Sequence, residues 1–140
     1  MNVKFHLLSV FRELFIPHHR SLEFRAKIFA AMICAKKNIS DSDFEDIKDI
    51  ADEIYPNDVK RIGVLIQTVK EYVNKVKVLN FLNLDNLLLD IDDELKNIKR
   101  YAKKIDFAHL RRLMVDSDEE DALIQQRVYE YFLEEVKRYS

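Results

Sequence analysis

The stretch from Ser21 to Pro56, SLEFRAKIFAAMICAKKNISDSDFEDIKDIADEIYP, carries the clearest structural pattern of the chain. Its apolar residues recur about every 3.6 positions in two blocks on either side of a polar turn, Lys36-Lys37-Asn38. In the first block the apolar face is Phe24, Ile28, Phe29, Met32 and Ile33, and the other face carries Glu23, Arg25 and Lys27. In the second block the apolar face is Phe44, Ile47, Ala51 and Ile54. The pattern predicts two helices that fold back on each other.

The residues at both ends of the second helix support this prediction. Ser40 is placed to cap the helix through its hydroxyl, and Asp43, three residues later, completes a capping-box pattern. Tyr55-Pro56 ends the helix, because proline lacks a backbone donor and disfavours helical geometry in the residue before it.

Composition places the whole chain in the all-α class. It has one glycine and two prolines in 140 residues, so it has few residues suited to tight β-turns. We therefore predict a single domain over residues 1–140, folded as a compact bundle of about six to seven helices. The single cysteine, Cys34, lies beside the first apolar face, which indicates a buried structural thiol and excludes an internal disulfide.

The remaining chain predicts further helices. The first spans Val3 to Phe15, and His18-His19-Arg20 connects it to the hairpin. After a cap at Asn57 or Asp58, the second keeps Val59, Ile62, Ile66, Val69, Val73 and Val76 in phase, with Gly63 indicating close packing or a bend. A break near Asn83 to Asn86 precedes a helix through Leu88, Ile91, Leu95, Ile98, Ala102 and Ile105. Asp106 either caps a shorter helix through Met114 or lies within a continuing one.

The end of the chain repeats the plan of the hairpin. A polar turn at Asp116-Ser117 precedes a helix with apolar residues from Leu123 through Ile124, Val128, Tyr131 and Phe132 to Val136. Ser117 and Glu120 form a second capping-box pattern. This gives a weak internal repeat, roughly residues 22–54 against 102–136.

The first turn, Ala35 to Asp43, resembles the helical hairpin of the tellurite-resistance TerB-like domains, which also occur at the front of DjlA-type DnaJ-like membrane chaperones. In those domains an apolar helix, a short polar turn, an aliphatic residue, Ser or Thr, and acidic residues follow in this order. The resemblance covers about residues 22–135 and includes the two-fold repeat. The common Asp-Gly of the family's first turn is replaced here by Lys37-Asn38, and Asp116-Ser117 keeps the acid of the second turn without the glycine.

Two sets of charged residues are candidates for binding protein partners. The second hairpin helix is strongly acidic, and the segment from Lys96 to Arg112 is basic. Complementary charged surfaces of this kind set orientation and association rate. The candidate residues are Asp41, Asp43, Glu45, Asp46, Asp49, Lys96, Lys99, Arg100, Lys103 and Arg111. Solvated helix faces are the alternative interpretation of both sets.

A metal site is the second hypothesis. Asp116, Asp118 and Glu119 could gather Ca²⁺ or another divalent cation, because such ions take several carboxylate oxygens. Acidic residues in the first turn of a helix are also expected from the helix dipole alone. The metal role implied by the TerB-like resemblance is weakened by the loss of Asp-Gly in the first turn.

Other classes of function find little support in the sequence. The net charge is -2, and the hairpin helix that would enter a DNA groove is acidic, so specific nucleic-acid binding is not expected. The four histidines lack metal-ligand spacing, and with one glycine there is no phosphate loop, so we do not expect an enzyme. No apolar run reaches about 18 residues, so no transmembrane span is expected. Arg12-Glu13 interrupts the N-terminal apolar run, so we expect no signal peptide and a cytoplasmic location.

Together these features predict a non-enzymatic, cytoplasmic protein-interaction module without a cofactor. The TerB-like resemblance adds the expectation of a stress- or envelope-associated role. The identity of the protein partner and self-association are left open.

Overall fold

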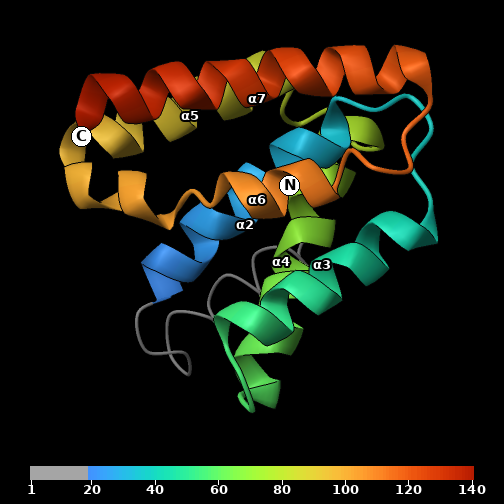
Figure 1. Cartoon of the computed structure of the whole chain (residues 1–140), viewed down its shortest axis with the longest axis horizontal. Coiled ribbons are helices and arrows are strands. Elements are labelled where there is room, and N and C mark those ends of the chain that lie inside the picture. The colour runs from blue at the N-terminus through green and yellow to red at the C-terminus, as the bar shows by residue number, and fades with distance from the viewer. Residues whose placement is uncertain (1–18) are drawn as a thin grey trace.

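The computed structural model describes residues 19–140, and every regular element in this part of the chain is a helix (Figure 1). The elements are α2 (His19–Cys34), α3 (Asp41–Ile54), α4 (Val59–Lys77), α5 (Leu84–Asn97), the 3₁₀ helix η1 (Lys99–Lys104), α6 (Phe107–Arg112) and α7 (Glu119–Tyr139). The predicted all-α helical bundle is therefore confirmed. The predicted helix from Val3 to Phe15 lies outside the described residues.

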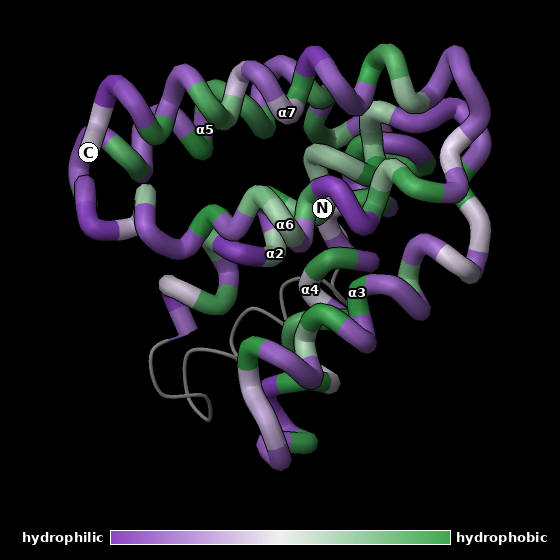
Figure 2. Tube along the Cα trace, in the orientation of Figure 1, coloured by the Kyte–Doolittle hydropathy of each residue, from purple (hydrophilic) through white to green (hydrophobic). Residues whose placement is uncertain are grey.

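Helix α2 forms the centre of the bundle. It is contacted by α4, α5, α7 and η1, and its residues from Ala26 to the end of the helix are all buried. Hydrophobic residues dominate along its length after the first turn (Figure 2). A helix that is apolar nearly all round must be enclosed by other elements, which explains why the chain is organised around it. It already contains His19 and Arg20, which we had placed in a connection.

The predicted polar face of α2 is not a solvent-exposed face. Glu23 and Arg25 are half-buried and Lys27 is buried. The Lys27 ammonium lies 2.7 Å from Asp90 Oδ2 and 3.0 Å from Glu94 Oε1, both on α5. Burial lowers the pKa of Lys27, but these two carboxylates outweigh that effect and raise it above its usual value. The prediction failed here because a charge with partners on a neighbouring helix can be buried.

Helix α3 has the predicted boundaries. The Asp43 carboxylate accepts a hydrogen bond of 2.9 Å from the backbone N–H of Ser40, and the helix ends at Ile54, directly before Tyr55-Pro56. Ile47 and Ala51 are buried, while Phe44 and Ile54 pack partly buried against the core. Local capping and periodicity therefore determine this helix.

Helix α4 begins where it was predicted to begin but does not bury all the expected residues. The Asp58 carboxylate caps it by accepting a hydrogen bond from the Arg61 N–H. Val59, expected in the buried stripe, is 82% exposed. The helix continues through Gly63, and no described atom lies within 4 Å of the position a β-carbon would occupy there. Close packing at this glycine is therefore not found among the described residues, and the predicted bend stays a prediction.

The segment from α4 to η1 contains two breaks. The first spans residues 78–83, earlier than predicted, and Asn83 caps α5 by accepting from the Asn86 N–H. The second was not predicted: α5 ends at Asn97, Ile98 leaves helical geometry (φ -134°, ψ 78°), and η1 follows. Tyr101, Ala102 and Ile105 still reach the core after this break. The apolar spacing alone therefore could not distinguish one helix from two.

The last two helices, α6 and α7, are joined by the second polar turn. Asp106 caps α6 by accepting from the N–H groups of Ala108 and His109. The predicted Ser117–Glu120 capping box is wrong, because α7 is capped by Asp118, whose carboxylate accepts from the Asp121 N–H at 2.8 Å. Along α7, Val128 and Phe132 are buried, whereas Leu123 is 57% exposed.

Candidate functional site

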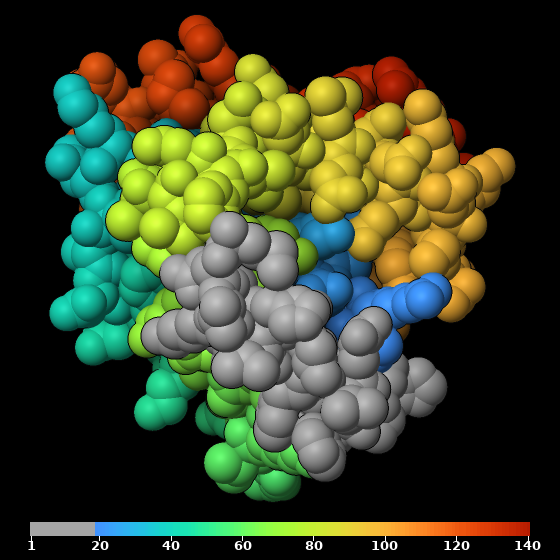
Figure 3. Space-filling view, turned by 180° about the vertical axis from the view of Figure 1, so that it is seen from behind, coloured from blue at the N-terminus to red at the C-terminus, as the bar shows by residue number. Residues whose placement is uncertain are grey.

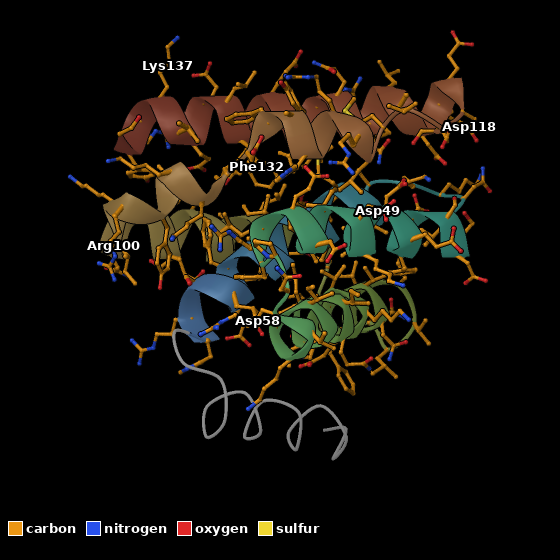
Figure 4. The ribbon with its side chains drawn as sticks, turned by 60° about the horizontal axis from the view of Figure 1, so that its bottom comes forward. Asp49, Asp58, Arg100, Asp118, Phe132 and Lys137 are labelled. Carbon is orange, nitrogen blue, oxygen red and sulfur yellow. The ribbon has the colours of Figure 1, made fainter. Side chains whose placement is uncertain are left out.

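The predicted functional residues lie in three places on the molecule. The acidic residues of α3 and the acidic start of α7 lie toward one end, and the basic residues of η1 lie toward the other. Figure 4 shows this separation, with Asp49 and Asp118 on one side of the view and Arg100 on the other. The third place is the contact between the turns of the two hairpins.

The turn between α2 and α3 contains a buried ion pair. Lys36 Nζ lies 2.7 Å from Asp43 Oδ1, and the two side chains are only 6% and 4% exposed. Lys36 belongs to the turn that we predicted to be polar, and its ammonium group points inward. Asp43 was predicted to bind a partner, but a buried carboxylate engaged by Lys36 and by the Ser40 N–H cannot do so.

The second turn completes this junction. The Asp121 carboxylate, buried at the start of α7, accepts hydrogen bonds from the backbone N–H groups of Lys37 (2.8 Å) and Asn38 (3.1 Å). The Asn38 side chain donates to Asp118 Oδ2 at 2.9 Å. The pKa of Asp118 is lowered first by the Asp121 N–H, then by Asn38 and the positive charge of Lys36. We call Lys36, Asn38, Asp43, Asp118 and Asp121 the turn junction.

The predicted metal ligands lie beside this junction. Asp118 is engaged as a helix cap and by Asn38, whereas Asp116 and Glu119 are exposed. Among residues 19–140, no three His, Cys, Asp or Glu side chains are grouped so that they could hold a metal ion. The metal alternative stays a prediction.

Four exposed or half-buried acids of α3 form an acidic surface with Asp116. Its members are Asp41, Glu45, Asp46, Asp49 and Asp116. Burial raises the pKa of Asp46 above its usual range, and the negative charges of Asp116, Asp43 and Asp49 raise it further. The positive charge of Arg112 lowers the pKa of Asp46 but does not outweigh burial and these negative charges.

Helix α6 borders the acidic surface and holds the end of the basic segment; of the two predicted alternatives, the shorter helix capped by Asp106 is the one observed. Arg112 forms an ion pair with Glu53 at the end of α3, and His109 Nε2 lies 3.5 Å from the same carboxylate. The hydrogen bond from Arg112 is the main cause of a lowered pKa at Glu53. Arg111, predicted to bind a partner, donates to the Tyr129 hydroxyl at 2.6 Å. These contacts separate α6 from the other basic residues.

The remaining basic residues form a basic surface at the end of α5 and on η1. Its members are Lys96, Lys99, Arg100, Lys103 and Lys104. Only Lys96 lies near a described carboxylate, at 3.6 Å from Asp92. Beside this surface, His19, Arg20, Ser21, Arg100, Tyr101 and Lys104 line an open hollow of about 390 Å³.

Gln125 and Cys34 are two buried groups of the core; the sequence predicted the second but not the first. Gln125 is buried on α7, and its side-chain amide donates to the backbone oxygens of Met32 and Leu113, both at 3.1 Å. It thus ties the ends of α2 and α6 to α7. Its spacing in the sequence could have indicated this burial, because Gln125 shares one face of the helix with Asp121, Val128 and Phe132. Cys34 is buried as predicted, and burial raises its pKa to about 12.

No protein-family model, curated protein or solved structure matches the chain. The resemblance to TerB-like domains therefore depends on the sequence features described above.

Proposed function

We propose that this chain is a non-enzymatic protein-interaction module, similar to TerB-like domains, that docks a protein partner through its acidic surface. The stress- or envelope-associated role is part of this proposal and comes from the resemblance alone. The basic surface is a second docking region for an acidic partner or a second copy of the chain.

The observation that carries this proposal is the segregation of exposed, unneutralised charge. Asp41, Glu45 and Asp49 are exposed and form no ion pair with any described residue, although the chain contains nearly equal numbers of acids and bases. A solvated helix face selected only for solubility would tolerate a mixture of acidic and basic residues. Like charges that raise the pKa of Asp46 cost stability, so we infer that they are retained for interaction with a basic surface.

Charge reversal on the acidic surface tests the proposal. The full chain is immobilised and partners are captured from extracts of its source cells, using wild type and the variant Asp41→Lys/Glu45→Lys/Asp49→Lys. We expect wild type to retain a specific protein that the variant loses. Its binding should weaken as salt rises, because screening reduces attraction between exposed charges.

The matched control is Asp85→Lys/Asp93→Lys/Glu134→Lys, which changes the net charge equally at exposed positions on α5 and α7. Circular dichroism checks that all three proteins are folded, and the affinity of the captured protein is then measured after purification. Equal affinity for wild type and the α3 variant would refute docking through the acidic surface.

A further inference from the structure

The hollow beside η1 combines a concave shape with an excess of positive charge. Arg20 comes from the start of α2, and Arg100 and Lys104 come from η1. The two elements lie side by side on the face seen in Figure 3, where the start of α2 is blue and η1 is gold to orange. None of the described residues that line this hollow is acidic.

The cations of the hollow are available to a ligand. None of Arg20, Arg100 and Lys104 forms an ion pair with any described residue. The Arg100 guanidinium lies 5.5 Å from the centre of the Tyr101 ring. That ring is buried and packs on Phe24, with their centres 5.0 Å apart. The hollow therefore has a fixed aromatic wall and cationic groups contributed by two elements.

A second hollow of similar size shows what distinguishes the first. It has a volume of about 380 Å³ and is lined by Arg25, Glu53, Ile54, Lys103, Lys104, Asp106 and His109. There Glu53 and Asp106 offset two of the three positive charges of Arg25, Lys103 and Lys104, the last of which lines both hollows, and His109 lies near both carboxylates. Among the described lining residues, the first hollow has cations without acids, so it favours an anion more strongly than the second.

We propose that the hollow formed by Arg20, Arg100, Tyr101 and Lys104 is a binding site for a phosphate group. Guanidinium groups match phosphate oxygens with paired hydrogen bonds, and a lysine ammonium adds a point charge. The phosphate belongs either to a small soluble molecule or to a lipid headgroup. This site goes beyond the proposed function, since it can bind phosphate whether or not a protein docks on α3.

Nuclear magnetic resonance of the full-length, ¹⁵N-labelled chain tests this inference. Inorganic phosphate is titrated at constant ionic strength, and the amide shifts of Ser21 and of Arg100 to Lys104 are followed. We expect saturable shifts at these residues. In Arg100→Gln/Lys104→Gln the phosphate affinity should fall by about tenfold or more, because two charge-assisted contacts are lost.

The matched control is Lys48→Gln/Lys60→Gln, which removes the same charge at exposed lysines outside the hollow. It should keep wild-type affinity. The same spectra report whether each variant is folded. Absent or non-saturating shifts in wild type, or equal weakening in both variants, would overturn the inference.

Vesicles distinguish the two sources of phosphate. The chain is sedimented with phosphatidylcholine vesicles that contain or lack phosphatidic acid. Sedimentation that requires phosphatidic acid and is lost in Arg100→Gln/Lys104→Gln would support the site and assign it to a lipid headgroup. Phosphate shifts without sedimentation would support the site and assign it to a soluble phosphate compound. Partner capture by the acidic surface is measured separately, so failure of either proposal leaves the other testable.

Discussion

The two turns that meet in the turn junction contribute opposite chemistry. The turn between α2 and α3 supplies donors: the Lys36 ammonium, two backbone N–H groups and the Asn38 amide. The turn between α6 and α7, with the first turn of α7, supplies the acceptors Asp118 and Asp121. The two backbone N–H groups and the Asn38 amide are paired across the two turns, whereas the Lys36 ammonium is paired with Asp43 on its own side.

This difference shows how the junction neutralises its own acids. Lys36 interacts with the acids at the starts of both helices. It forms an ion pair with Asp43 of α3, and its positive charge contributes to the lowered pKa of Asp118 before α7. A protein with acids in both turns would need another cation between them. Here Lys36 supplies that cation from within the chain.

The largest effect is expected from breaking the ion pair of the first turn. Asp43→Ala leaves the Lys36 ammonium buried and removes the acceptor of the Ser40 N–H. Losing one partner of a buried pair lowers the free energy of unfolding by about 3–5 kcal/mol. Urea denaturation followed by circular dichroism measures this change.

Asp52→Ala is the control for Asp43→Ala, because it removes an exposed acid from the same helix. The double variant Lys36→Met/Asp43→Asn should be more stable than Asp43→Ala, since no buried charge is left without a partner. A loss in Asp43→Ala no larger than that in Asp52→Ala would show that the ion pair does not stabilise the turn.

A smaller effect is expected from weakening the contact between the turns. In Asp121→Asn one carboxylate oxygen becomes an amide nitrogen, which cannot accept the N–H of Lys37 or Asn38. A buried donor left without an acceptor costs about 1–3 kcal/mol of unfolding free energy. Denaturant titration should show this loss, while Glu120→Gln, an exposed neighbour, should unfold like wild type. Equal stability of all three proteins would contradict the assigned role of Asp121.

The sequence predicted the limits of α3 well because their signals are local, but it did not predict that α3 packs mainly on α4 rather than back on α2. Ser40, Asp43 and Tyr55-Pro56 act on residues within one helical turn of themselves, so α3 has its expected limits. The break at Ile98 was missed because the apolar residues on both sides of it still reach the core. The acceptor role of Asp121 depends on residues 84 and 83 positions away, which periodicity cannot bring together. Lys36 pairs with Asp43 only seven residues later, but the apolar period gives no direction for a lysine in a turn. The same limit applies to the phosphate hollow, because Arg20 and Arg100 lie on different elements.

The smallest effect is expected when divalent cations are added. The melting temperature then shows whether Lys36 alone neutralises the acids of the junction or a metal ion also binds there. After chelator treatment, we expect millimolar Ca²⁺, Mg²⁺, Mn²⁺ or Zn²⁺ to leave the melting temperature of wild type unchanged, because Lys36 already neutralises the nearest carboxylates. A ligand bound only by the folded state must raise that temperature. A rise that disappears in Asp116→Asn/Asp118→Asn, but persists in Asp85→Asn/Asp93→Asn, would establish the metal alternative.

In Lys36→Ala the internal cation is removed, so a rise with Ca²⁺ in that variant alone would show that Lys36 occupies the place of an ion. If Ca²⁺ raises the melting temperature of neither wild type nor Lys36→Ala, these carboxylates lie too far apart to bind the same ion.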